Sequence, residues 1–308
     1  MNFALATLWH ERQRYLPGIL AVAFSAILIA LTCGLLLGLL SVTSIPIRRS
    51  PAQLWVGSAG VLSVDIAGIV PTGWYTRVME SPEVTACEDY CEGFSKWKKA
   101  NGADELCIVI GSRLEDGSLG AVGALTPELR EKLTEPNAVV IDESERSRLG
   151  LTGGVGETGE ILGRKVRVVG LIKGYSSLAG PYVFCSLQTA RPLLRLRSDQ
   201  ASYLLAKCRA PAEAPAVVER LRDKYGDEMS AFSSGDFAWR SEYLSAFLML
   251  SLFSIPLFVV DLLMEASNQE YPFATTSYAF RTGLATMAFI VLAFFSGNNL
   301  NAFVYFRF

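Results

Sequence analysis

The segment YLPGILAVAFSAILIALTCGLLLGLLSVTSIPI, residues 15–47, carries no charged side chain. A helix rises about 1.5 Å per residue, so about twenty apolar residues cross the hydrocarbon core of a bilayer. We therefore expect residues 17–40 to form a transmembrane helix with some tilt. The alternative is a cleaved signal peptide that ends near Ser41-Val42-Thr43, but the apolar core of such peptides is only about 7–15 residues long.

Two further apolar runs lie in the last quarter of the chain. Residues 243–264 contain Pro256 and Asp261. Neighbouring helices can satisfy the carbonyl that a proline frees, and a carboxylate near the interface can reach water, so this run predicts a second span. Residues 284–306 are uncharged but hold three asparagines, and they are a possible third span. The predicted fold class is two to three α-helical transmembrane segments that carry a large α+β extracytoplasmic domain.

The charges that flank the first span do not decide its orientation. Arg12 and Arg14 precede it and Arg48 and Arg49 follow it, so the positive-inside count is a tie. Apolar and polar residues alternate over residues 1–14, which suits either a helix in the membrane interface or a solvated tail. The expected organisation is an interfacial helix and first span (1–46), an α+β domain (47–240), and a second and possible third span with a short cytoplasmic loop (241–308).

The middle of the chain is typical of a soluble domain of mixed secondary structure. Runs of β-branched and aromatic residues predict strands, and capping residues and prolines predict where helices begin. The expected strands are 54–56, 61–66, 106–110, 138–141, 165–172, 182–185 and 203–206. The expected helices are 72–80, 127–133, 143–149, 187–194 and 212–225. Strands and helices do not alternate strictly, which favours an α+β domain with its own core.

Several kinds of chemistry are disfavoured by the composition. A net charge of −2 gives no reason to expect nucleic acid. His10 is the single histidine, so a Ser-His-Asp relay or a multi-histidine metal site would have to form around it. The phosphate-binding pattern Gly-x-x-x-x-Gly-Lys-Ser/Thr does not occur, so the chain lacks that ATP-binding motif. We expect no catalytic residues, no cofactor and no metal.

The six cysteines leave two structural alternatives open. Cys33 lies in the first apolar run, and the other five lie in the middle domain. The spacing of Cys87 and Cys91 lacks the second pair that a zinc site needs. Structural thiols or one disulfide are therefore both favoured over metal binding.

Two motifs imitate functional sites. Residues 154–159, GVGETG, match the dinucleotide-binding fingerprint, which requires a helix after the glycines. The residues that follow, up to the β-rich run 165–169, predict a hairpin instead. The acidic stretch 142–146 is interpreted as a capped, solvated helix start rather than as a pair of catalytic carboxylates.

Beyond these patterns, the chain resembles MacB/FtsX-type ABC transporter permeases, closest to their DevC-like exporter branch. The resemblance covers residues 1 to about 240 as many modest matches in the right order. The matching segments are FALATLWHER (3–12), LWV (54–56), VVIDES (139–144) ahead of LGL (149–151), GRKVRVVG (163–170) and GPYVF (180–184).

The resemblance implies a multi-pass protein of the cell inner membrane, with a cytoplasmic N-terminus and a periplasmic domain. It implies a separate ABC ATPase subunit as partner, a homodimer and a periplasmic adaptor protein. The family's cytoplasmic ATPase-coupling loop corresponds to a segment that includes Thr275, Thr276, Tyr278, Phe280 and Arg281. This segment matches only loosely, because the acidic residue expected after the arginine is absent. The expected spans do not include the family's fourth, so we expect the C-terminal part to be divergent or truncated relative to the family.

Three functions are compatible with these observations. The first is a permease subunit that couples ATP hydrolysis by a separate ATPase to movement of the periplasmic domain. The second is a membrane-anchored extracytoplasmic binding or signalling module without transport activity. The third, a membrane-tethered hydrolase, needs a nucleophile and a base that the sequence does not offer.

Overall fold

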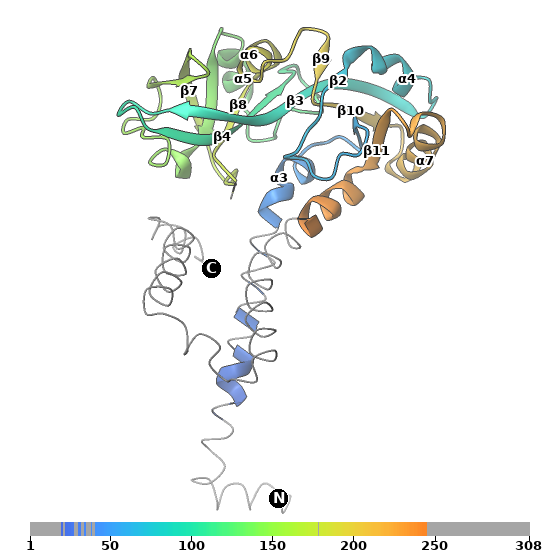
Figure 1. The fold of residues 1–308 in the computed structure, drawn as a ribbon, viewed down its shortest axis with the longest axis horizontal. Coiled ribbons are helices and arrows are strands. Elements are labelled where there is room, and N and C mark those ends of the chain that lie inside the picture. The colour runs from blue at the N-terminus through green and yellow to red at the C-terminus, as the bar shows by residue number, and fades with distance from the viewer. Residues whose placement is uncertain are drawn as a thin grey trace, which may run out of the picture. The chain divides into compact units, whose positions relative to one another are not determined.

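The structure is a computed structural model that describes residues 41–177 and 179–244, together with residues 20, 22–27, 30, 31, 34 and 38 (Figure 1). The chain divides into two compact units, residues 1–247 and 248–308, and the second lies wholly outside the described residues. The expected third span, the coupling loop and most of the second span therefore lie outside them. The expected N-terminal helix and most of the expected first span are also outside the described residues. Within the described residues, no helix is both long enough and apolar enough to cross a membrane.

One nine-stranded mixed sheet organises the domain (Figure 1). Its strand order is β11-β1-β10-β3-β4-β8-β5-β7-β6, and the pairs β4–β8 and β5–β7 are parallel. The strands are β1 (Leu54–Ser58), β3 (Val84–Lys98), β4 (Asp104–Ser112), β5 (Ala138–Asp142), β6 (Thr158–Ile161), β7 (Arg164–Ile172), β8 (Tyr182–Ser186), β10 (Tyr203–Cys208) and β11 (Met229–Ser233). A two-stranded sheet pairs β2 (Val70–Pro71) with β9 (Gln200–Ala201).

Part of this sheet closes on itself. β3 pairs with β6 through Trp97 and Ile161, so the six strands β3-β4-β8-β5-β7-β6 form a ring. The first half of the same long strand pairs with β10, which extends the sheet to β1 and β11. β3 is therefore the strand that joins the closed part of the sheet to the open part.

Short helices complete the domain. They are η1 (Val42–Ser44), α3 (Ile45–Arg48), η2 (Thr72–Trp74), α4 (Tyr75–Met79), α5 (Pro127–Leu133), η3 (Glu143–Glu145), α6 (Leu187–Leu193), η4 (Pro211–Glu213) and α7 (Ala214–Tyr225). A last helix covers residues 234–244 of the described chain. Strand residues that alternate in direction divide the core, because successive side chains point to opposite faces. α7 and α4 cover one apolar cluster, α6 covers a second, and the aromatic residues of the opposite face form the third.

Most of the predicted elements are confirmed with small shifts of their ends. The hairpin predicted after the glycine motif is formed by β6 and β7. Leu162 and Gly163 at its turn have φ values of 49° and 77°, which is the geometry of a two-residue turn that matches strand twist. The glycines of residues 154–159 thus lead into a strand.

Two predicted elements are wrong. Residues 61–66 are not a strand, because Gly60 turns the chain at a φ of 75° and the carbonyls of Ser63 and Val64 accept hydrogen bonds from the Tyr203 hydroxyl instead of a neighbouring strand. Residues 143–149 form only the turn η3, since their carboxylates bind neighbouring loops. The strand β3 was not predicted, because charged residues interrupt its apolar alternation.

The five cysteines of the middle domain are free, buried thiols. This is the first of the two alternatives left by the sequence. Burial raises the pKa of Cys91 and of Cys107 to about 12. These side chains therefore act as small apolar core residues.

Candidate functional site

The two chain segments that lead into and out of the domain meet at one place. The first segment is η1 and α3, and the second is the helix of residues 234–244. Figure 1 shows α3 beside this last helix, below the sheet. Because both predicted spans continue from these segments, the contact between them is the candidate functional site.

A capping arrangement fixes the start of the last helix. The Ser233 hydroxyl accepts a hydrogen bond from the backbone N–H of Asp236 and donates one to its carboxylate. A serine cap of this kind satisfies a backbone N–H that has no partner within the helix. The Ser234 hydroxyl donates to the carbonyl of Ala52, which ties the same turn to the segment before β1.

Three polar side chains, which we call the junction clamp, connect the two segments: Ser44, Arg48 and Glu242. The Arg48 Nε–H donates to the Glu242 carboxylate and to the Ser44 hydroxyl, both at 2.9 Å. The Ser44 hydroxyl in turn donates to the same Glu242 oxygen. Ser44 is fully buried, so the clamp reaches from the protein surface into the core.

The clamp is electrostatically favourable when Glu242 is ionised. Partial burial alone would raise the pKa of Glu242, but hydrogen bonds from Arg48 and Ser44 lower it overall. The same hydrogen bond from the carboxylate raises the pKa of Arg48. A carboxyl group whose pKa is lowered by folding stabilises the folded state at neutral pH and loses this effect as the solution becomes acidic.

Aromatic packing fixes the inner face of the last helix. The Phe237 ring stacks on Phe232 at 4.9 Å and lies 5.7 Å from the rings of Trp55 and Tyr203. One turn later, the Ser241 hydroxyl accepts a hydrogen bond from the backbone N–H of Val64. The helix and the loop of residues 59–69 are thereby held against the same face of the sheet.

Two carboxyl groups lie near the aromatic residues of this face. Glu92 is 2% exposed, and neither of its carboxylate oxygens makes a hydrogen bond to a described residue. Burial, together with repulsion from Asp65, raises the pKa of Glu92 well above its usual value. Burial raises the pKa of Asp65 to about 6. Burial also raises the pKa of Tyr90, Tyr182 and Tyr203, so these neighbours carry no charge that could offset one on Glu92, and folding favours the neutral form of its carboxyl group.

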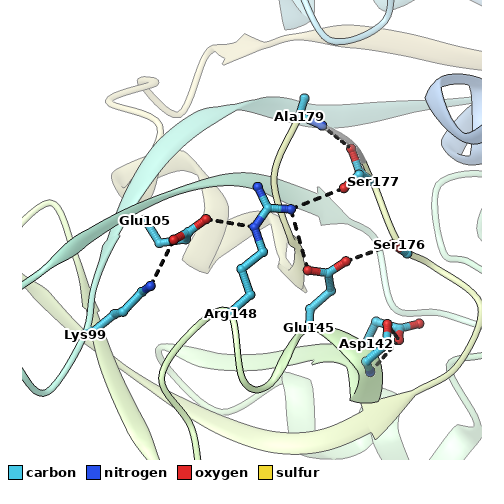
Figure 2. A network of polar contacts seen from close by, with 9 residues as sticks. Lys99, Glu105, Asp142, Glu145, Arg148, Ser176, Ser177 and Ala179 are labelled. Carbon is cyan, nitrogen blue, oxygen red and sulfur yellow. Dashed lines mark hydrogen bonds and ion pairs between the residues drawn. The ribbon is translucent and has the colours of Figure 1, made fainter. Parts of the chain in front are cut away.

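A second polar network lies at the other end of β3. Figure 2 shows Arg148 between the carboxylates of Glu105 and Glu145. The guanidinium donates to Glu105 at 2.8 Å and lies 3.7 Å from Glu145, which also accepts a hydrogen bond from Ser176. Lys99 binds the remaining oxygen of Glu105 at 2.9 Å.

The acidic stretch 142–146 belongs to this network. Asp142 caps η3 by accepting from the N–H of Ser144, as the sequence predicted, and its other oxygen accepts from the N–H of Tyr175 at 2.7 Å. The stretch is not solvated, however, since Asp142 and Glu145 are 2% and 6% exposed. Their carboxylates hold two loops together, so this is a structural site.

One open groove of about 490 Å³ lies at the carboxyl ends of β4 and β8. It is lined by residues of the loop after β4, of α5 and of the start of α6. The Arg130 guanidinium is already bound to the carbonyls of Leu125 and Glu115.

The predicted coupling residues Thr275, Thr276, Tyr278, Phe280 and Arg281 lie outside the described residues. Sequence reasoning missed the junction clamp. Arg48 is the first charged residue after the first apolar run, and Glu242 is the last before the second. The position of these two charged residues next to the two apolar runs was visible in the sequence, but it did not show that their side chains are in contact.

Fold and site together define a class of protein. It is an α+β domain whose first segment, η1 and α3, lies beside its last, the helix of residues 234–244. A family model described as the MacB-like periplasmic core domain matches residues 19–224, about two thirds of the chain. The chain therefore belongs to this family, a domain of ABC-transporter permeases, which are membrane proteins that work with a separate ATPase.

Two solved structures are similar to the chain. The periplasmic region of MacB from Actinobacillus actinomycetemcomitans is 13% identical, with a TM-score of 0.41 over 62% of this chain and 94% of that one. The extracellular domain of the noncanonic ABC-type transporter YknZ from Gram-positive bacteria is 12% identical, with a TM-score of 0.38 over 57% and 99%. At these values the similarities carry no weight, and membership rests on the family model. No curated protein matches the chain.

Proposed function

We propose that the chain is the membrane permease subunit of an ABC-type exporter of the DevC-like branch. In this function a separate ATPase hydrolyses ATP in the cytoplasm, the spans move, and the periplasmic domain moves with them. The single observation that carries the proposal is the match of the MacB-like family model over residues 19–224. The subunit would be a multi-pass protein of the inner membrane, would form a homodimer, and would work with a periplasmic adaptor.

The junction clamp supports this coupling on physical grounds. A movement of one span relative to the other reaches the domain only if both segments are attached to it firmly. Glu242 and Arg48 join segments that are 194 residues apart, and Phe237 anchors one of them to the core. The domain would then follow the spans as a rigid body between two states set by nucleotide.

The ATPase contact is proposed for residues 266–283, with Thr275, Thr276, Tyr278, Phe280 and Arg281 as coupling residues. The test is affinity purification of the full chain in mild detergent, with ATPase activity measured in the eluate. We expect an ATPase to co-purify, and we expect Phe280→Ala and Arg281→Ala to lose most of it. Arg195→Ala, a change of an exposed arginine on the domain, is the matched control. Absence of an ATPase, or full retention by both variants, contradicts the proposal.

A second candidate is a membrane-anchored binding module, which the groove at the ends of β4 and β8 favours. In that case deletion of residues 266–308 leaves binding of an extracytoplasmic partner intact. If this deletion instead abolishes both the association with the ATPase and the activity that depends on the extracytoplasmic partner, the hypothesis of a binding module is wrong. The hypothesis of an exporter subunit then stands.

A further inference from the structure

Four large apolar side chains are exposed at the end of the domain that carries the junction clamp. Trp239 and Tyr243 are 63% and 59% exposed, and Leu62 and Ile66 are 47% and 58% exposed. The two aromatic rings stack on each other at 5.3 Å with an interplanar angle of 14°. A group of exposed apolar side chains in one region of a soluble domain marks a surface that something else covers.

A single hydrogen bond explains why these side chains share one end. The Val64 N–H donates to the Ser241 hydroxyl, and both residues are fully buried. Leu62 lies two positions before Val64, and Ile66 lies two positions after it. Both of their side chains are exposed, whereas Val64 is buried. On the helix, Trp239 and Tyr243 are likewise two positions from Ser241, which places them on the opposite, outward side.

Three arginines accompany the apolar side chains. Arg48, Arg49 and Arg240 are exposed. The Arg49 guanidinium lies 4.4 Å above the Tyr175 ring, and that of Arg240 lies 5.4 Å above the Phe232 ring. These ring contacts fix two positive charges on the two segments that carry the junction clamp. We call these seven residues the junction surface.

We propose that the junction surface rests on the outer surface of the lipid bilayer. Trp239 and Tyr243 would lie at the level of the headgroups, Leu62 and Ile66 would contact the upper acyl chains, and the arginines would bind lipid phosphates. Tryptophan and tyrosine are enriched at this depth of a membrane because one part of the ring is apolar and another is polar. Arginine pairs well with phosphate.

The position of the junction surface in the chain favours lipid over a protein partner. Tyr243 is the first residue of the apolar run 243–264, and Ser44 follows the apolar run 17–40 by only four residues. Any bilayer that contains these runs must therefore begin next to the junction clamp. This inference rests on the proposed function, since it requires both runs to be spans.

The test uses tryptophan fluorescence of the full chain in nanodiscs that contain brominated phospholipid. Bromine on the acyl chains quenches only tryptophans near the membrane. The parent is Trp9→Phe, which removes the tryptophan of the N-terminal segment, and Trp55 and Trp97 are buried in the domain. We expect Trp239→Phe to reduce bromine-dependent quenching at least about twofold. Trp74→Phe, a change at η2, is the control and is expected to leave quenching unchanged.

Two results overturn the inference. One is equal quenching in the parent and in Trp239→Phe. The other is a Trp239 that neither bromine nor aqueous acrylamide quenches, which means that a second copy or another protein covers it. A thermal unfolding curve like that of the parent shows that Trp239→Phe is folded.

A second variant and a separate control complete the design. Leu62→Ser with Ile66→Ser is expected to weaken quenching of Trp239, since it removes the other apolar contacts. Failure of the proposed function gives a different result: the chain then stays in the aqueous fraction without detergent, and Trp9 of the unmodified protein is not quenched.

Discussion

Glu92 is a carboxyl group in an environment that does not tolerate its charge. It faces Ile110 across β3 and β4, with tyrosine rings nearby and no hydrogen bond from a described residue to either oxygen. The folded state therefore binds a proton that the unfolded chain releases above a pH of about 4.3. Because folding raises the pKa, the contribution of Glu92 to stability is complete at low pH and decreases as the pH rises.

The first prediction concerns this proton. Glu92→Gln keeps the shape of the side chain but has no charge at any pH. At about pH 4 the variant and the parent are expected to have similar melting temperatures, and at about pH 8 the variant is expected to be more stable by at least about 1 kcal/mol, or about 2–4 °C. The measurement is thermal unfolding between pH 4 and 8.5. Glu219→Gln, on the exposed side of α7, is the control, and identical pH profiles for parent and Glu92→Gln contradict the assignment.

The second prediction concerns the thiols. Cys91 and Cys107 are fully buried, and burial raises the pKa of each to about 12. At pH 8 their thiolate fraction is about a thousandfold lower than that of an ordinary cysteine with a pKa near 8.5. In a Cys33→Ser background, reaction with a thiol-specific disulfide reagent is expected to be slow in the native protein and complete in denaturant. Rapid native reaction of Cys91 or Cys107 refutes this.

Among the elements, β6 is the strand that closes the six-stranded ring. It is only four residues long, and its pairing with the end of β3 brings Gly159 against the Trp97 ring. A Cβ at Gly159 would overlap that ring, which is fully buried. Glycine is required here because of this close approach, and the same glycine is part of the motif that resembles a dinucleotide fingerprint.

The third prediction follows from that contact. Gly159→Ala is expected to destabilise the domain by about 1–3 kcal/mol, since the tryptophan or the strand must move. Thermal unfolding measures the change. At Gly123 an added Cβ meets no atom within 4 Å, so Gly123→Ala is the matched control. Equal melting temperatures for the two variants would show that β6 does not pair with β3 as closely as the contact between Gly159 and Trp97 requires.

At the scale of the whole molecule, the domain and the predicted spans are connected through the junction clamp. Two Arg–Glu pairs allow this role to be separated from general stability. Arg48 binds Glu242 at 2.9 Å in the clamp, and Arg77 binds Glu228 at 2.6 Å elsewhere on the surface. In each pair one of the two side chains is more than half exposed, and ion pairs that are open to solvent in this way each contribute only about 0–1 kcal/mol to stability.

The fourth prediction compares these two Arg–Glu pairs and depends on the proposed function. Glu242→Ala and Glu228→Ala are both expected to shift the free energy of unfolding by no more than about 1 kcal/mol. Only Glu242→Ala is expected to reduce transport by the full chain with its ATPase, because it loosens the attachment between the segments of the two predicted spans while ATP hydrolysis continues. Transport and ATPase activity are measured together. If both variants lose transport equally, or if neither loses it, the clamp has no special role in coupling.

Local sequence patterns determine much of the secondary structure of this protein. The long uncharged runs, the β-rich segments of β5, β7 and β8, the caps at Thr126 and Asp142 and the hairpin between β6 and β7 all follow from residues that are close together in the chain. The contact of Glu242 with Ser44 and Arg48, the closure of β3 on β6 and the burial of Glu92 follow only from the tertiary structure. Periodicity and capping depend on neighbours in sequence, whereas these contacts join residues that packing alone brings together, so no local pattern encodes them.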